Sequence, residues 1–215
     1  MTLNDIALKY GTDKSSDVHF YTRHYEKYFE PLRNKPIKLL EIGIQGGKSL
    51  KLWEEYFPNA TIVGLDIHDC SYMATERIKI VVGNQSDQNR LKNISETYGP
   101  FDIIIDDGSH HNEDMKLGVE TLFPLLNKGG IYVVEDLHTC YWGSTHNTGA
   151  PVFMDRLKTM LDEVNSAGKS GKADIAKDDK DELCCSKMFG EMTWWEKNVE
   201  FLHIYRHIVF LKRYD

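Results

Sequence analysis

Short apolar runs and helical patterns alternate along most of the chain. Five runs are nearly continuously apolar, which is typical of parallel strands that helices cover on both faces. Between the runs, apolar residues recur three and four positions apart, as they do on one face of a helix. The predicted strands are 37–44, 61–67, 77–82, 101–106 and 131–135, and the predicted helices are 48–57, 87–98, 113–126 and 151–167.

The carboxy-terminal pattern differs from this alternation. Two further apolar runs, 199–205 and 208–212, are separated only by Arg206 and His207. So short a connection predicts a tight antiparallel hairpin at the edge of the sheet. Together, the patterns predict an α/β fold with a doubly wound, mostly parallel, seven-stranded sheet that ends in an antiparallel hairpin.

The first part of the chain predicts a separate helical segment, residues 1–35, placed before a domain formed by residues 36–215. Tyr21, Tyr25 and Tyr28 lie three and four positions apart, so one helix face carries them. This face either packs on the core or closes as a lid over a ligand. With 215 residues, we expect a single globular unit overall. The Gly-, Lys- and Asp-rich stretch 166–181 predicts a surface loop, and whether it gates a site stays open.

Composition narrows the functional classes. The net charge of −7 argues against broad binding to nucleic acid or to an anionic membrane, because both need a basic surface. The sequence has no apolar run of about 20 residues and no signal-peptide pattern. The four cysteines have no zinc-type spacing, and we expect them to be reduced and the protein to be cytoplasmic. They are Cys70, Cys140, Cys184 and Cys185.

Acidic side chains follow two of the predicted strands. Asp107 and His110 come after the run that ends at Asp106, and Glu135 and Asp136 end the run that begins at residue 131. If the two strands are neighbours, three carboxylates and a histidine converge on one crevice. Oxygen ligands at this density suit a hard cation such as Mg²⁺, and His110 is placed to accept a proton. Because side chains alternate along a strand, only one of Asp106 and Asp107 should face the site. The motif favours Asp107, and Asp106 is a candidate to cap or to contact the cofactor.

A glycine turn follows the first strand. Glu41, Gly43 and Gly46 lie in a segment where the chain passes from strand to helix, and glycine permits close approach of a ligand there. Gln45 stands where a dinucleotide-binding loop would need glycine, so a nicotinamide cofactor is disfavoured. Asp66 ends the second strand, where an acid can accept hydrogen bonds from ribose hydroxyls. A plain structural turn and a capping aspartate are the alternatives.

A polar turn follows the third strand. Gln85, Ser86 and Asp87 are candidates to contact an adenine edge, and Asp87 is equally suited to cap the next helix. These two roles are compatible.

These motifs together resemble those of the S-adenosylmethionine (SAM)-dependent and metal-dependent sugar O-methyltransferases of macrolide biosynthesis. The glycine turn is common to class I methyltransferases in general, whereas the combination of Asp-Gly-Ser-His with Glu-Asp is much more specific. The matching segments are 9–14, 39–47, 64–66, 85–87, 105–110 and 133–136, with Trp142 and 208–212.

The resemblance implies a Rossmann-like methyltransferase fold, SAM and Mg²⁺ as cofactors, and a role in natural product biosynthesis. It implies that Asp107, Glu135 and Asp136 bind Mg²⁺ and that His110 is the general base. His138 lies just beyond the Glu-Asp pair and is either a second acid or base or a simple loop histidine. The acceptor would be a small molecule, a sugar or glycoside hydroxyl, and self-association is common among superfamily relatives.

The residues then predict O-methylation of a vicinal diol that chelates the metal, with His110 removing the proton. A catechol or other phenolic diol is an alternative acceptor, for which Trp142, Trp194, Trp195 or the amino-terminal tyrosines would supply an apolar slot. A nicotinamide-dependent oxidoreductase and a non-catalytic binding protein on the same scaffold are the remaining alternatives.

Overall fold

The computed structural model describes residues 1–143, 152–165 and 193–215. The predicted surface loop 166–181, Cys184 and Cys185 lie outside the described residues. Cys70 and Cys140 are both buried and free. Within the described ranges, no helix combines the length and the apolar character needed to span a membrane.

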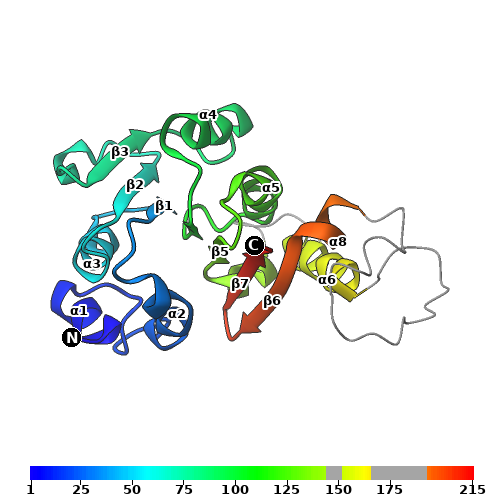
Figure 1. Ribbon diagram of the computed structural model, residues 1–215, viewed down its shortest axis with the longest axis horizontal. Helices are drawn as coiled ribbons and strands as arrows, with labels where there is room; N and C mark the ends of the chain where they lie inside the picture. Colours follow the sequence, from blue (N-terminus) through cyan, green and yellow to red (C-terminus); the bar gives the residue numbers. More distant parts are fainter. Residues whose placement is uncertain (144–151, 166–192) are drawn as a thin grey trace.

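A single sheet of seven strands runs through the centre of the molecule (Figure 1). Its order is β3-β2-β1-β4-β5-β7-β6, with five parallel strands followed by the antiparallel pair β7 and β6. This confirms the predicted fold class and the hairpin, whose turn is Arg206 and His207. The strands are β1 Lys38–Ile42, β2 Thr61–Asp66, β3 Ile78–Val82, β4 Ile103–Asp106, β5 Ile131–Val134, β6 Val199–Tyr205 and β7 Ile208–Arg213.

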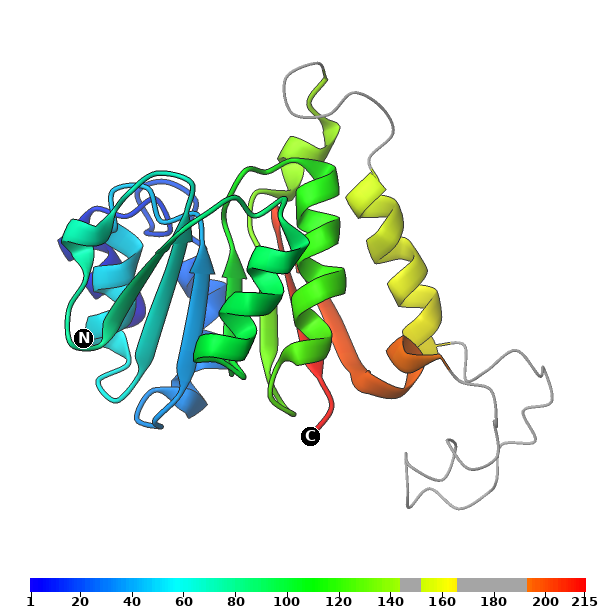
Figure 2. The same cartoon turned by 90° about the horizontal axis from the view of Figure 1, so that it is seen from above.

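Helices cover both faces of the sheet (Figures 1 and 2). α1 Leu3–Tyr10, α2 Thr22–Phe29 and α3 Lys48–Tyr56 lie on one face, and α4 Gln88–Tyr98, α5 Asn112–Leu122 and α6 Val152–Asn165 lie on the other. The short α8 Trp194–Asn198 leads into β6, and 3-10 turns span Glu30–Leu32, Ser71–Met73, Phe123–Leu125 and Leu137–Tyr141. The predicted helix 113–126 ends early because Pro124 cannot continue the α-helical hydrogen bonding.

The alternation of strand side chains divides the core into two layers. Leu39, Ile103 and Ile105 pack with α1, α2 and α3, whereas Leu40 and Ile104 pack with α4, α5 and α6. Buried apolar area on both faces is the main stabilising contribution of such a sheet. It also holds the carboxyl ends of the central strands in fixed positions.

The strand order reverses between β1 and β4, which is where ligands bind in open α/β sheets. β4 and β5 are parallel neighbours, as the convergence of the acidic residues required. The backbone N–H of Asp107 donates to Ile42 O at 2.9 Å, and that of Glu135 donates to Asp106 O at 3.0 Å. Both acidic clusters therefore begin at the same edge of the sheet.

The amino-terminal segment is part of the core on one face. Tyr21, Tyr25 and Phe29 are buried among residues of α3 and of the strands. The Tyr25 ring meets Trp53 and Phe210 in edge-on contacts, with centroid distances of 5.3 and 5.4 Å. Of the two readings of this tyrosine face, packing on the core is the one observed.

Candidate active site

A cavity of about 640 Å³ lies along the carboxyl edge of the sheet. Residues from the amino-terminal segment and from the ends of four strands line it, among them Lys14, Gly43, Asp66, Asp107, His110 and Asp136. A smaller cavity of about 160 Å³ shares Gly43, Asp66 and Gly108 with the first and extends to Gln85. The two cavities are therefore neighbours, and we refer to them together as the cavity, with an acidic end at Asp107 and Asp136 and a glycine-lined end at Gly43 and Asp66.

The glycine turn allows the ends of β1 and β4 to approach closely. Gly43 has φ of +80°, and a Cβ there would lie 2.1 Å from the carbonyl oxygen of Asp107. No other residue type fits this position without moving the backbone. Gln45 also adopts a left-handed conformation, with φ of +42°, so this turn reaches its shape without the glycine that a dinucleotide loop has.

Asp66 is bound to the glycine turn by backbone hydrogen bonds. Its Oδ2 accepts from the N–H groups of Ile44 at 3.0 Å and Gln45 at 2.9 Å, and its Oδ1 accepts from His68 N–H at 2.8 Å. The side chain still lines both cavities. The end of β2 and the turn after β1 therefore hold each other in place.

Gln85 connects the smaller cavity to β4. Its Nε2 donates to Asp106 Oδ1 at 3.2 Å, and its Oε1 accepts from Ser109 N–H at 2.6 Å. Asp106 also accepts from the Tyr132 hydroxyl at 3.2 Å; it is 1% exposed and lines neither cavity. Burial raises the pKa of Asp106 to about 7, against the hydrogen bonds from Tyr132 and Gln85. Asp106 thus reaches the cavity only through Gln85.

The neighbours of Gln85 have different positions. Asp87 accepts from the N–H groups of Asn89 and Arg90 and so caps α4, which confirms the capping role. Ser86 is exposed and lines neither cavity. Of the three predicted adenine contacts, Gln85 alone is placed at the cavity.

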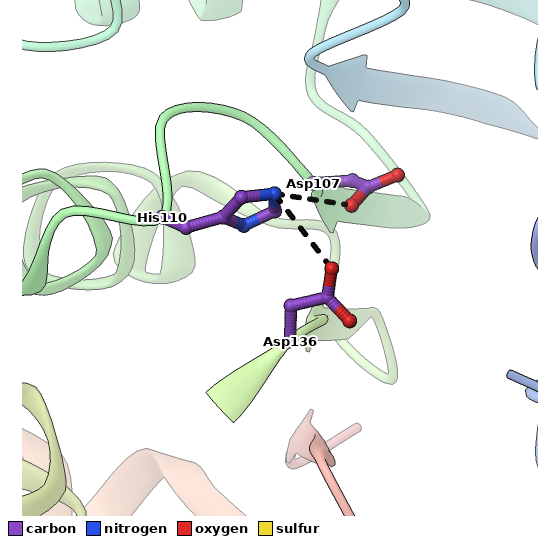
Figure 3. A group of neighbouring side chains, drawn as sticks. All are labelled: Asp107, His110 and Asp136. Atoms are coloured by element: carbon purple, nitrogen blue, oxygen red, sulfur yellow. Dashed lines mark ion pairs between the residues drawn. The ribbon is translucent and has the colours of Figure 1, made fainter. Parts of the chain in front are cut away.

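At the acidic end, Asp107, His110 and Asp136 face one another (Figure 3). His110 Nε2 lies 3.9 Å from Asp107 Oδ1 and 3.7 Å from Asp136 Oδ2. One ligand atom from each of the three side chains lies within 4.8 Å of the others. The two carboxylates offer the oxygen ligands that a hard divalent cation prefers, and the imidazole lies beside them.

Both His110 and Asp136 have left-handed backbone conformations, with φ of +57° and +54°. Non-glycine residues rarely adopt this region, and such strain is concentrated at functional sites. The carbonyl oxygens of both residues accept from the Thr139 hydroxyl, at 3.3 and 2.8 Å. Thr139 therefore links the two loops that carry the site.

Glu135 is buried next to this group but is not one of its three members. Its carboxylate contacts the ammonium group of Lys14 at 2.9 Å and accepts from the Tyr25 hydroxyl. Lys14 is fully buried, and its Nζ also lies 2.5 Å from Asp107 Oδ2 and 3.8 Å from Glu41 Oε1. One buried cation is thus shared by three carboxylates.

Lys14 and the carboxylates around it shift one another's pKa values. Although burial disfavours the ammonium form, the carboxylates of Asp107, Glu135 and Glu41 raise the pKa of Lys14 well above its ordinary value. Burial, followed by the neighbouring charge of Asp107, raises the pKa of Glu135. Burial raises the pKa of Glu41 to about 7, in opposition to Lys14. An added divalent cation would favour the ionised form of these carboxylates.

Glu41 and His138 also lie outside the cavity lining. Glu41 is fully buried, and its Oε2 accepts from the Ser49 hydroxyl at 2.8 Å. His138 packs against Trp142 and His207, with ring centroids 4.9 and 4.4 Å apart. Glu41 therefore contacts two residues that line the cavity, Lys14 and Ser49. His138 is not among the described residues that line either cavity.

Two of the three tryptophans considered for an aromatic acceptor slot lie away from the site. Trp194 and Trp195 pack on Phe123 next to the start of β6. That strand starts opposite Arg213, which pairs with Gly130 just before β5. These two rings therefore lie at the opposite end of β5 from Glu135.

Three side chains of the site were not predicted from the sequence. Lys14 lies in the matching segment 9–14, which carried no predicted role for it. Tyr21 donates to Asp136 Oδ1 at 2.6 Å. Tyr25 donates to Glu135. The spacing of the tyrosines indicated a shared face, but nothing local indicated that their hydroxyl groups reach acids more than 100 positions away.

Similarity to known proteins agrees with this geometry. No family model matches the chain. The mycinamicin VI 2''-O-methyltransferase of Micromonospora griseorubida is 32% identical over 223 residues, covering 98% of this chain and 52% of the relative. The demethylmacrocin O-methyltransferase of Streptomyces fradiae is 44% identical over 147 residues, covering 65% of this chain and 37% of the relative.

Solved structures extend the likeness to the fold. MycE methyltransferase from the mycinamycin biosynthetic pathway, in complex with Mg and SAH, superimposes with a TM-score of 0.84 at 31% identity. The match covers 100% of this chain and 54% of that chain. The chain thus spans about half the length of the relatives it matches. By sequence and by fold, the relatives of this chain are macrolide sugar O-methyltransferases, and it has the fold of class I SAM-dependent methyltransferases.

Proposed function

We propose that this protein transfers a methyl group from SAM to a hydroxyl of a sugar or glycosylated natural product, with Mg²⁺ as the required ion. The observation that carries the proposal is the convergence of Asp107, His110 and Asp136 at the acidic end of the cavity. The mycinamicin relative is named for 2''-O-methylation, and one MycE structure contains Mg, SAH and mycinamycin VI. Both support a small glycosylated acceptor.

The chain's own residues suit a hard divalent ion. Asp107 Oδ1 and Asp136 Oδ2 both face His110 Nε2, and their side chains are 16% exposed, so an ion can reach them from the cavity. Glu135 lies directly behind them at the end of β5 and is the third acid of the proposed set. When bound, Mg²⁺ lowers the pKa of a hydroxyl that it coordinates and orients two adjacent hydroxyls.

The glycine-lined end of the cavity suits SAM. Asp66 offers a carboxylate at the end of β2, in the position where an acid can hold ribose hydroxyls. Gly43, Gly108 and Gln85 line the smaller cavity. The two glycines let the turns after β1 and β4 and the Gln85 side chain pack closely around it. SAM bound here would present its methyl group for in-line displacement by the acceptor oxygen.

His110 is the proposed general base. Its ring is 24% exposed at the cavity, and the carboxylates on either side stabilise the imidazolium that forms when it accepts a proton. Asp107 and Asp136 thus act twice, as oxygen ligands and as the charges that flank the base. We propose that the acceptor is one hydroxyl of a vicinal diol.

The amino-terminal segment belongs to the proposed site. We infer that residues 36–215 form the cofactor-binding unit and that residues 11–14 of the preceding segment form one wall of its cavity. Lys9 and Tyr10 bond to Glu55 on α3, both at 2.6 Å, which holds this wall against the unit.

The test is a transfer assay with labelled SAM, a panel of glycosides and catechols, and EDTA. The proposal expects methyl transfer to a glycoside diol that EDTA abolishes and Mg²⁺ restores. Transfer only to catechols would replace the acceptor class. Binding of neither SAH nor Mg²⁺ in equilibrium dialysis would refute the mechanism.

A further inference from the structure

Three carboxylates at the carboxyl edge are held by side chains from one short stretch of the amino-terminal segment. Tyr21 donates to Asp136 Oδ1 at 2.6 Å, and Tyr25 donates to Glu135. Lys14 contacts Asp107 Oδ2 and Glu135. Each acid of the proposed metal site therefore has an anchor that is more than 90 positions away in sequence.

The anchored oxygens are the ones that face away from the centre of the site. Asp136 uses Oδ1 for Tyr21 and leaves Oδ2 facing His110 at 3.7 Å. Asp107 uses Oδ2 for Lys14 and leaves Oδ1 facing His110 at 3.9 Å. Holding one oxygen of a carboxylate fixes the direction of the other, which is how outer groups orient metal ligands.

The anchoring tyrosines are themselves rigid. Tyr21 is 2% exposed and stacks on His19 at a centroid distance of 5.0 Å. Tyr25 is fully buried, with Trp53 and Phe210 against its ring. A donor in such surroundings keeps its direction, so its hydrogen bond constrains the acid rather than following it.

We propose that Tyr21 and Tyr25 are positioning residues for the divalent cation: their hydroxyl groups orient Asp136 and Glu135 so that the carboxylates meet the ion in a fixed geometry. This proposal rests on the proposed metal-dependent function. It makes α2 and the residue before it part of the ion-binding machinery, rather than a lid or only a wall of the core.

α2 and the residue before it provide a matched series of substitutions. Tyr21→Phe, Tyr25→Phe and Tyr28→Phe each remove a single hydroxyl and keep the ring. The Tyr28 hydroxyl bonds to His203 and Tyr205 on the hairpin, at 2.7 Å each, and Tyr28 does not line the cavity, so Tyr28→Phe is the control. The measurement is the Kd for Mn²⁺, by titration calorimetry on the full chain with SAH present.

We expect the Kd for Mn²⁺ to rise about 10- to 100-fold in Tyr21→Phe, the range typical of lost outer-shell contacts. Tyr25→Phe should have a smaller effect, because Lys14 still holds Glu135. The Kd for SAH should stay within about two-fold in all three variants. At saturating metal, kcat should return toward the value of the unmodified protein, whereas the metal concentration that gives half-maximal activity should stay raised.

Each outcome has a definite meaning. If Tyr21→Phe and Tyr25→Phe both bind Mn²⁺ as Tyr28→Phe does, the positioning role is wrong and the metal-dependent function stands. Equal losses of SAH and Mn²⁺ affinity would indicate a structural role instead and also overturn it. If the unmodified protein binds no Mn²⁺, the proposed metal site itself fails. Should Tyr21→Phe not fold, by its circular dichroism spectrum, Tyr25→Phe decides the question.

Discussion

The acidic residues at the two ends of the cavity receive their hydrogen bonds from different parts of the chain. At the glycine-lined end, Asp66 accepts from the backbone N–H groups of Ile44, Gln45 and His68, all within 22 positions of it. At the acidic end, Asp107 and Asp136 are held by Lys14 and Tyr21, which are 93 and 115 positions away. The first end is built mainly from local turns, whereas the second requires the amino-terminal segment to be docked. Changes in that segment should therefore affect the metal more than SAM.

The largest expected effect is at the histidine of the acidic end. His110→Ala should lower kcat about 10²- to 10⁴-fold, the range for loss of general-base catalysis, because His110 is the proposed base that lies between Asp107 and Asp136. The Kd for SAH should change little, since the residues around Asp66 are untouched. Single-turnover assays and SAH titration measure the two quantities.

His138→Ala is the matched control for that substitution. Its ring packs on Trp142 and His207 outside the cavity lining, so we expect kcat to stay within about ten-fold of the unmodified protein. A loss as large as that of His110→Ala would make His138 the second acid or base of the reaction.

The acidic end should next be separable by its metal. Asp136→Asn removes a charged ligand while keeping its shape, and we expect the Kd for Mn²⁺ to rise at least about ten-fold. Calorimetry with Mn²⁺ and with SAH on the same sample measures both affinities. A parallel loss of SAH binding would show that the two ends are not independent.

The reciprocal change lies at the glycine-lined end. Asp66→Asn should raise the Kd for SAH about 10- to 100-fold, corresponding to roughly 1.5–3 kcal/mol for hydrogen bonds to a charged group. Mn²⁺ affinity should remain near that of the unmodified protein. If Mn²⁺ binding weakened equally, the local construction of this end would be refuted.

The smallest expected effect concerns the docking of α2 at acid pH. His24 is 8% exposed and stacks on Tyr205, and its Nδ1 has no hydrogen-bond partner. Burial, together with the charges of Arg23 and Lys27, lowers the pKa of His24 from 6.5 to about 4. The unfolded chain therefore binds this proton more readily, and stability that is complete above pH 6.5 is lost as the pH falls toward 4.

Denaturant unfolding at pH 7 and pH 4.5 measures this contribution. Between pH 7 and pH 4.5, the free energy of unfolding of His24→Phe should fall by about 1 to 2 kcal/mol less than that of the unmodified protein. An identical pH dependence for the two proteins would remove His24 as a cause. If α2 undocks first as the pH falls, the affinity for Mn²⁺ should already be weaker at pH 5, while the affinity for SAH is still unchanged.

The fold was predictable because its signals are local. The five apolar runs became β1 to β5 with boundaries shifted by only a few residues, and Arg206–His207 formed the expected turn. The helix that was expected to reach residue 126 ends at Leu122, because the hydrophobic spacing did not account for Pro124. Burial on both faces followed from strands that lack a polar alternation.

The site was predictable only in part. The motifs indicated Asp66, Asp107, His110 and Asp136, and these four side chains line one cavity. Asp106 and Glu41 were expected to contact the cofactor, but they lie behind the cavity, because inward-facing positions of a two-sided sheet point into the core. Burial of this kind depends on what packs against the strand.

By itself, the sequence determined the order of strands and helices along the chain, the turn that Gly43 requires, and the acids that follow β4 and β5. Such properties follow from backbone sterics and from hydrophobic periodicity over a few residues. Only the tertiary structure decided that Lys14 is buried among Glu41, Asp107 and Glu135, and that Tyr21 and Tyr25 reach the acids. These contacts join distant parts of the chain, and their strength comes from excluding water around charges, which no local pattern records.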